Sequence, residues 1–493
     1  MELKVKVLKW SAGLPVAMLN LKTAQKMGIH TKERVTIRTL AKKPKEFSTI
    51  IDTISKIVKR DEIAVSSELK KNLNLKIGQK VEVIIAESPK SLYFIKKKLN
   101  KKALSSSEIR AIIGDVVNNS LSEAEIALFV SAMYKQGMTM KETISLIRAI
   151  SETGNKLDIK AKYIADKHSI GGIAGNRTTP IVVAICAAAG LTMPKTSSRA
   201  ITSAAGTADV IETIAKVEFS MKDLKKIVKK TGGCLVWGGA LGMVPADSKI
   251  IQVEKILKID PEAQLLASIM SKKLAVGSKY ILIDIPYGKT AKVNKKRGLK
   301  LKKKFEYLGK VFKKKLKCVL TDGSQPMGNG VGSALELRDV IEVLDPSKQG
   351  PKDLEDKSVF LSSEILEMTG KAKKGKGSVI AQEILTSGKA YKKFQQIIEA
   401  QGGKVKIPRL GKFKKNVLSP RAGKIREIHN KKINSLARAA GCPSDKFAGL
   451  SIFVSVGDKI KKKQKLLTIY AQSKSRLKEA LKFLKQTNPI VVK

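Results

Sequence analysis

Aromatic residues, histidine and cysteine are all scarce in this sequence. Only 4% of the 493 residues are aromatic although 43% are hydrophobic, so the interior must be mainly aliphatic. A protein that stacks nucleic-acid bases on broad aromatic surfaces is therefore not expected. The 4 cysteines and 3 histidines show no spacing typical of a metal site, and we expect a reduced cytoplasmic protein with no metal and no cofactor.

Long apolar runs are also missing. The longest, residues 181–189, is far shorter than the roughly 20 residues that a membrane-spanning helix needs. The first six residues alternate charged and apolar side chains and lack the apolar core of a signal peptide. We therefore expect a soluble protein that is not exported and does not bind membranes.

Acidic residues are few relative to basic ones. The chain has 96 Lys and Arg against 43 Asp and Glu, a formal net charge of +53 at pH 7. Clustered positive charge is typical of nucleic-acid binding, but here the lysines are spread along the whole chain. This spread favours a solvated, non-specific coat, and no specific nucleic-acid partner is expected. The alternative, a basic nucleic-acid-binding protein, predicts RNA binding that weakens steeply with salt.

The hydrophobic period changes along the chain and predicts several domains, as a chain of this length requires. Residues 1–88 alternate apolar and polar side chains as strands do, and are expected to form a β-rich domain. Residues 89–165 have helical periodicity, with a Glu three residues after each of Ser105, Ser122 and Thr139. This capping-box spacing predicts a helical subdomain.

The rest of the sequence predicts an α/β domain and a smaller C-terminal domain. Over residues 166–405, short apolar strands alternate with helical stretches, which indicates a mixed or largely parallel sheet. Residues from about 245 to 275 are expected to join the helical subdomain instead. Residues 406–493 contain short strands and tight turns and should form an α+β domain. The predicted fold class is therefore α/β, with a helical subdomain facing the α/β domain.

Two glycine-rich segments carry the clearest chemical signal. The first, 166–172, contains Lys167 and Ser169, and a helix with proline in its first turn is predicted to start near Thr179. The second, 197–209, contains serines, an arginine and two threonines. Glycine lets backbone amides approach an oxyanion, and hydroxyls, cations and a helix N-terminus favour negative charge. One such loop could be a simple turn, but two with matching groups predict a phosphate site.

Other polar residues are candidates for the same site. His168 lies between a Lys and a Ser in a loop, which favours a hydrogen-bonding or acid role over core packing. Asp260, followed by proline, also has the form of a helix N-cap. Ser268 and Lys272 lie four residues apart and share a helix face. Lys292 follows an apolar strand, in a segment that suits a second phosphate site or an exposed turn equally well.

At these residues the sequence resembles the thymidine and pyrimidine-nucleoside phosphorylase family, most closely its archaeal AMP phosphorylase branch. The resemblance extends over nearly the whole chain. Its most specific marks are Lys167-His168-Ser169 and the run from Ser197 through Thr207 and Asp209 to Glu212. It implies a helical domain facing a phosphate-binding α/β domain, a homodimer that can assemble further, and inorganic phosphate as co-substrate.

The resemblance also implies roles for single residues. Asp260 matches the proton donor of the AMP phosphorylase branch, and His168 is the second candidate for that role. Val253 stands where the nucleoside enzymes place a pyrimidine-reading arginine, and Lys292 stands where they have an aromatic residue, which favours a nucleotide substrate. The expected substrate and phosphate ligands are Lys167, Ser169, Gly172, Ser197, Ser198, Arg199, Ala200, Ile201, Thr202, Ser203, Thr207, Ser268, Lys272 and Lys292.

The implied reaction is phosphorolysis of a nucleoside 5′-monophosphate to ribose 1,5-bisphosphate and free base. AMP is the expected substrate, with CMP and UMP open. A nucleoside phosphorylase acting on uridine or thymidine is the alternative within the family, and a phosphoribosyltransferase of similar architecture is a third reading. Whether Asp260 or His168 is the main donor stays open at this point.

Overall fold

The computed structural model describes residues 1–8, 15–201 and 203–493, which form two compact units. Unit 1 holds residues 1–155 and 243–272, and unit 2 holds residues 156–242 and 273–493. Among the described residues, no helix is both long and apolar enough to cross a membrane. Within the same ranges, no three His, Cys, Asp or Glu side chains are grouped so as to hold a metal ion.

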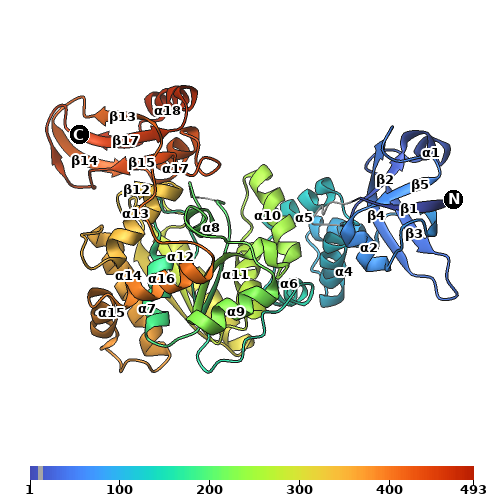
Figure 1. Cartoon of the computed structure of the whole chain (residues 1–493), viewed down its shortest axis with the longest axis horizontal. Coiled ribbons are helices and arrows are strands. Elements are labelled where there is room, and N and C mark those ends of the chain that lie inside the picture. Colours follow the sequence, from blue (N-terminus) through green and yellow to red (C-terminus); the bar gives the residue numbers. More distant parts are fainter. Residues whose placement is uncertain (9–14, 202) are drawn as a thin grey trace. The chain divides into compact units, whose positions relative to one another are not determined.

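The N-terminal part of unit 1 is a closed six-stranded barrel with strand order β1-β5-β2-β4-β3-β6 (Figure 1). The alternation of apolar and polar residues explains why these strands close around a core. Val35 and Ile37 are fully buried in the barrel core, while Thr36 and Arg38 are partly exposed. The elements are β1 (Glu2–Val7), β2 (Ala17–Asn20), α1 (Leu21–Lys26), β3 (Arg34–Thr39), β4 (Glu46–Ile54), β5 (Glu62–Val65), α2 (Ser67–Leu73) and β6 (Lys80–Ile85).

The rest of unit 1 is helical. The three predicted capping boxes are present at Ser105, Ser122 and Thr139, where side chain and backbone of each cap bond reciprocally with the Glu three residues later. Glu142 additionally accepts a buried hydrogen bond from Lys98 Nζ at 2.8 Å. The helices are α3 (Lys90–Leu99), α4 (Ser106–Val117), α5 (Glu123–Gln136), α6 (Met140–Glu152), α10 (Pro245–Leu257) and α11 (Glu262–Val276), the last of which continues into unit 2.

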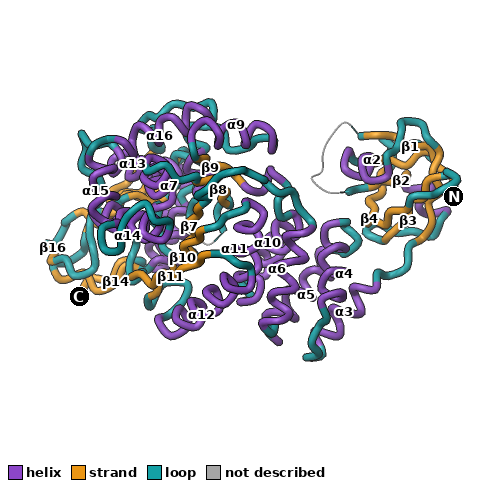
Figure 2. Tube along the Cα trace, turned by 90° about the horizontal axis from the view of Figure 1, so that it is seen from below, coloured by secondary structure: helices purple, strands orange, loops and turns teal. Residues whose placement is uncertain are grey.

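Unit 2 is built on parallel strands. Strands β11-β10-β7 form one parallel sheet and β8-β9 form another. A parallel bridge between Ile164 and Thr192 links the edges at β7 and β8, so the five strands lie side by side in the order β11-β10-β7-β8-β9 (Figure 2). Every loop that leaves a carboxyl end therefore lies at the same edge. The strands are β7 (Ala165–Ser169), β8 (Met193–Ser197), β9 (Gly233–Trp237), β10 (Tyr280–Tyr287) and β11 (Lys315–Asp322).

Helices pack against these strands around an aliphatic core. Helix α7 is buried over nearly its whole length, as its apolar run requires. The helical elements are α7 (Thr178–Ala188), α8 (Thr207–Ile211), α9 (Met221–Thr231), η1 (Gly238–Leu241), α12 (Lys295–Val311), α13 (Ser333–Leu344), α14 (Lys352–Met368), α15 (Gly377–Thr386) and α16 (Lys389–Ala400).

The C-terminal part of unit 2 has two antiparallel sheets and two helices. One sheet, β12-β15-β17-β13, takes in β12, a strand that the sequence places within the α/β region. The elements are β12 (Gly330–Val331), β13 (Phe413–Leu418), β14 (Gly423–Ile428), α17 (Asn430–Ala439), β15 (Gly449–Ile452), β16 (Lys459–Ile460), β17 (Lys465–Ala471), α18 (Lys474–Thr487) and β18 (Ile490–Val492). The predicted fold class, with a β-rich N-terminal and an α+β C-terminal part, is confirmed.

Candidate active site

The first predicted loop leaves the carboxyl end of β7 and leads into helix α7. The helix begins at Thr178 with Pro180 in its first turn, as predicted. Gly171 and Gly172 both have positive φ, +83° and +95°. A Cβ at Gly172 would lie 2.9 Å from Cβ of Lys292, so glycine is required where the loops after β7 and β10 meet. The structure thus places Lys292 directly against the first loop.

Lys167 is buried beneath this loop. Its Nζ lies 2.6 Å from Oγ1 of Thr178, in the first turn of α7. Burial lowers the pKa of Lys167 to about 7, and the Asp284 carboxylate opposes this effect only in part. Burial alone would raise the pKa of Asp284, but Lys357 and Lys167 together hold it below its ordinary value. A buried lysine at a helix N-terminus is well placed to receive an anion, whose charge would restore its proton.

Asp166 anchors the strand that carries Lys167. Its carboxylate accepts hydrogen bonds from Lys195 Nζ at 3.0 Å and Lys273 Nζ at 2.6 Å, and all three side chains are buried. Lys195 Nζ also donates to the backbone carbonyl of Lys167 at 2.8 Å. Although burial alone would raise the pKa of Asp166, the two ammonium groups hold it below its ordinary value. This ionic cluster fixes the backbone from which Lys167 projects.

The second predicted loop is held closed by Asp209. Its Oδ2 accepts from the backbone amides of Ala200 at 2.7 Å and Gly206 at 2.8 Å. A Cβ at Gly206 would lie 2.4 Å from the carbonyl oxygen of Ser198, so the two ends of the loop are in close contact. The loop therefore follows β8 as a compact turn that ends at the N-terminus of α8.

Arg199, a predicted phosphate ligand, is paired with carboxylates in the described structure. Its two terminal nitrogens form a bidentate pair with Glu212, both at 2.8 Å, and also reach Asp209 at 3.3 Å and Glu218 at 3.0 Å. The guanidinium lies 4.7 Å from the ring centroid of Trp237. Three acidic side chains thus converge on its terminal nitrogens and tie the second loop to α8 and the segment after it. Its contact with phosphate stays a prediction.

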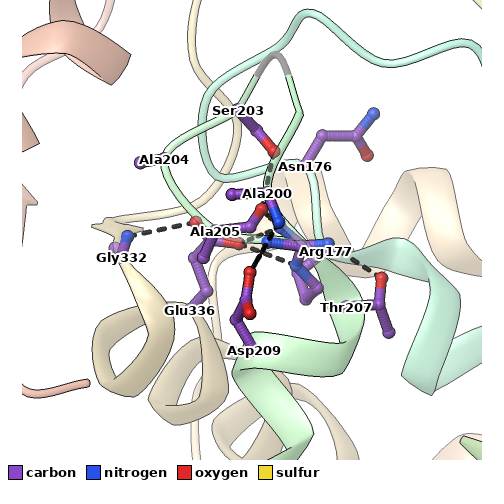
Figure 3. Close-up of polar contacts among 12 residues, drawn as sticks. Asn176, Arg177, Ala200, Ser203, Ala204, Ala205, Thr207, Asp209, Gly332 and Glu336 are labelled. Carbon is purple, nitrogen blue, oxygen red and sulfur yellow. Dashed lines mark hydrogen bonds and ion pairs between the residues drawn. The ribbon is translucent and has the colours of Figure 1, made fainter. Parts of the chain in front are cut away.

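Arg177 joins the two loops, a role that the sequence did not reveal (Figure 3). Its guanidinium donates to Glu336 Oε2 at 2.7 Å, to Thr207 Oγ1 at 2.8 Å and to the carbonyl of Ala205 at 2.7 Å. Glu336 accepts a further hydrogen bond from the amide of Gly332 at 3.0 Å. In the sequence, the only sign of this role is the position of Arg177 between the first glycine loop and α7. Because Thr207 Oγ1 accepts the hydrogen bond from Arg177, its hydroxyl proton stays free to donate, as a phosphate ligand must.

The remaining predicted ligands of unit 2 lie on the same loops. Ser197 Oγ donates to the carbonyl of Val236 at 3.2 Å, and Ser203 Oγ to that of Ala205 at 2.6 Å. Ser169 Oγ accepts from the amide of Gly171 at the limiting distance of 3.5 Å. His168 is the penultimate residue of β7 and is partly buried. The structure thus gathers the unit 2 candidates at the carboxyl edge of the parallel strands, with Ser198 and Ile201 on the second loop; Thr202 lies outside the described residues.

Three predicted site residues belong to unit 1. Asp260 precedes α11 and is partly buried. Ser268 and Lys272 share a face of α11, as predicted, and Lys272 Nζ donates to Ser268 Oγ at 2.7 Å. Lys272 also pairs with Oδ2 of the buried Asp247 at 2.5 Å. Ser268, Lys272 and Asp247 thus form a polar cluster of α10 and α11 in unit 1.

The lowered pKa of Lys167 predicts a pH-dependent anion affinity. Because the protonated lysine binds an anion, sulfate affinity should be constant below about pH 6 and should fall up to tenfold per pH unit above about pH 7. Calorimetric titration with sulfate, which stays a dianion from pH 6 to 9, measures this. His168→Asn serves as the control for imidazole titration and should keep the profile, whereas Lys167→Met should bind weakly and without pH dependence. A flat wild-type profile would contradict the prediction.

Three family descriptions match consecutive parts of the chain. Residues 92–154 match the helical bundle domain of a glycosyl transferase family, and residues 161–391 match its a/b domain. Residues 424–491 match the pyrimidine nucleoside phosphorylase C-terminal domain. The fold and these matches define a glycosyl transferase with a phosphorylase-type C-terminal domain.

Curated relatives narrow this class. The AMP phosphorylase of Methanococcus aeolicus is 40% identical over 99% of this chain and 97% of the relative. That of Thermococcus kodakarensis is 43% identical, again over 99% of this chain and 97% of the relative. The chain therefore belongs to the AMP phosphorylase family. A solved anthranilate phosphoribosyltransferase from Thermus thermophilus shares the fold, with a TM-score of 0.52 and 17% identity, over 63% of this chain and 99% of that one.

Proposed function

We propose that this glycosyltransferase cleaves AMP by phosphorolysis, releasing adenine and ribose 1,5-bisphosphate. The observation that carries the proposal is full-length similarity to AMP phosphorylases, combined with two glycine loops and a buried lysine of low pKa at one edge of a parallel sheet. We further propose that the enzyme works in the cytoplasm as a homodimer or a larger homo-oligomer, with inorganic phosphate as co-substrate and no other cofactor.

The loops of unit 2 would hold inorganic phosphate. Lys167 supplies a cation, the Thr207 hydroxyl supplies a donor, and the N-terminus of α7 adds the positive end of a helix dipole. The hydroxyls of Ser169 and Ser197 are proposed to turn to the phosphate when it binds, which for Ser197 means giving up its bond to the carbonyl of Val236. Such preorganised donors act strongly where water is excluded, as the burial of Lys167 indicates here. The bound phosphate is thereby positioned as the nucleophile.

The 5′-phosphate of the nucleotide would lie near Lys292 and the second loop. Lys292 lies against Gly172, where the loops after β7 and β10 meet. Two anionic groups must then share one site, and the cations Lys167 and Lys292 reduce their repulsion. Ser268 and Lys272 are proposed to complete the nucleotide site, on the basis of the family resemblance.

The reaction breaks one bond and forms one. A phosphate oxygen attacks C1′ of the ribose while the bond from C1′ to the base nitrogen breaks, and its electron pair stays on the base. Asp260 is proposed to donate a proton to that base, with His168 as the second candidate. The phosphate oxygen becomes the new substituent of C1′, which gives ribose 1,5-bisphosphate.

A substrate panel tests the proposal. The enzyme is incubated with AMP, CMP, UMP, adenosine, uridine and thymidine, with and without inorganic phosphate, and free base is followed by chromatography. We expect phosphate-dependent release of adenine from AMP and at least a hundredfold lower kcat/KM for adenosine, about 2.7 kcal/mol of binding through the 5′-phosphate. Faster turnover of uridine or thymidine would favour the nucleoside phosphorylase alternative. No phosphate-dependent release, together with salt-sensitive RNA binding, would favour the nucleic-acid-binding alternative.

A further inference from the structure

Helix α17 of the C-terminal part of unit 2 presents three polar side chains at intervals of four residues: Asn430, Asn434 and Arg438. Residues at this spacing lie on one face of a helix. Asn430 and Asn434 are buried, whereas Arg438 is exposed. The helix lies beside β15 and β12 (Figure 1). The three side chains all bond to loops at the carboxyl edge of the parallel strands.

Asn430 connects three of these loops. Its Oδ1 accepts from the amide of Ala174 at 3.0 Å, in the loop after β7. Its Nδ2 donates to Thr290 Oγ1 at 2.9 Å, in the loop after β10, and to the carbonyl of Gly323 at 3.1 Å, directly after β11. A fully buried amide that uses both its acceptor and its donors in this way fixes the mutual spacing of the three loops.

Asn434 and Arg438 hold the fourth loop, which follows β8. Asn434 Oδ1 accepts from the amide of Ala204 at 2.8 Å. Arg438 Nη2 donates to the carbonyls of Ile201 at 2.9 Å and Ser203 at 2.7 Å. In the second loop, the amide of Ala204 and the carbonyls of Ile201 and Ser203 are therefore satisfied by this helix.

One rigid helix therefore sets the distance between the predicted phosphate loops. Residues four apart rise about 6 Å along a helix axis, and this fixed rise separates the bonds that Asn430 and Asn434 make to the two glycine loops. The described residues of both loops lack regular secondary structure between strand and helix, and the bonds from α17 add to the closure of the second loop by Asp209. A preorganised pair of loops binds an anion with less loss of conformational entropy than a mobile pair.

We propose that α17 is a positioning element of the phosphate site, and that Asn430, Asn434 and Arg438 are positioning residues that raise phosphate affinity by holding the loops in register. The proposal rests on the proposed function for the identity of the ligand. It assigns to the C-terminal domain a part in substrate binding. The contribution is to phosphate binding and not to the bond-breaking step.

The test compares four single variants of the full chain. Asn434→Leu removes the acceptor for Ala204 without changing charge, and Arg438→Met removes the donors to Ile201 and Ser203. Arg438→Lys is the conservative variant, which keeps a cation and can restore part of the donation. Lys431→Met is the matched control, because Lys431 is an exposed cation on the same helix. Arg438 is itself exposed, so its variants should fold normally.

The readouts are steady-state kinetics and hydrogen exchange by mass spectrometry. For Asn434→Leu and Arg438→Met we expect KM for phosphate to rise about three- to tenfold with kcat within about twofold, since saturating phosphate orders the loops again. Amides of the loop around Ala204 should exchange faster in free enzyme, while those of β7 and β10 should not. Arg438→Lys should recover much of the affinity, and Lys431→Met should match wild type.

Two outcomes would overturn the proposal: an unchanged KM and an unchanged loop exchange in Arg438→Met, or an equal rise of KM in Lys431→Met. The second result would mean that surface charge, and not loop position, sets phosphate affinity. A wild-type enzyme that releases no base would contradict the proposed function instead. In that case the exchange rates around Ala204 still decide whether α17 holds the loop.

Discussion

Asp166→Ala is expected to lower the free energy of unfolding of unit 2 by about 3–5 kcal/mol, because it leaves two buried ammonium groups without their shared carboxylate. Lys195 and Lys273 bond to opposite oxygens of Asp166, and their side chains are 5% and 1% exposed. Denaturant unfolding measures the loss. A Trp10→Phe background leaves Trp237, in β9, as the single fluorescent reporter of this unit.

The size of this loss should depend on pH. Burial lowers the pKa of Lys273 and Asp166 opposes that effect, so removal of the carboxylate lowers the pKa further. The folded variant then binds fewer protons than the unfolded chain up to about pH 10, and its free energy of unfolding rises with pH in that window. In wild type the pKa of Lys273 is itself lowered to about 7, so wild type gains stability in the same way above that pH. The gap between variant and wild type should therefore shrink as the pH rises to about 7 and stay constant from there to pH 9.

An exposed ion pair of unit 2 is the matched control. Glu479 lies 2.9 Å from Arg476, and both side chains are 56% exposed. Glu479→Ala should cost less than about 1 kcal/mol at any pH, because exposed pairs are screened by solvent. A loss of similar size for Asp166→Ala would contradict the proposed role of the buried cluster.

Features specified by neighbouring residues were predictable from the sequence. The capping boxes at Ser105, Ser122 and Thr139 depend on residues three apart, and all three form. The barrel follows from alternation within single strands such as β3, and the start of α7 follows from Pro180. The positions of the glycine loops at strand ends follow from the same local patterns.

Features that depend on distant residues were not predictable. Asp166 and Lys273 are 107 positions apart, and Ala174 and Asn430 are 256 apart. In a chain with 96 basic residues, composition does not distinguish the few buried lysines from the many solvated ones. The sequence places Arg199 in the second loop, but its acidic partners Glu212 and Glu218 become apparent only when the loop is folded.

Asp260→Asn is expected to lower kcat for AMP phosphorolysis by about 10²–10⁴-fold, the usual loss when a general acid is removed. The amide keeps the shape of the carboxyl but cannot supply the proton, so KM for AMP should change by less than about threefold. Glu262→Gln is the matched control, because Glu262 lies in the first turn of α11, two residues further along. It should retain wild-type turnover, measured as adenine released at saturating phosphate.

A substrate whose leaving group needs no proton separates acid catalysis from positioning. 4-Nitrophenyl riboside 5′-phosphate releases a stable phenolate, so Asp260→Asn should lose far less activity on it than on AMP, at most about tenfold. His168→Asn is compared on both substrates in the same way. If the leaving-group-dependent loss appears in His168→Asn and not in Asp260→Asn, the proton donor is the histidine. An equal loss on both substrates in Asp260→Asn would mean that this carboxyl orients the nucleotide, because a group that only positions the ribose affects every leaving group alike.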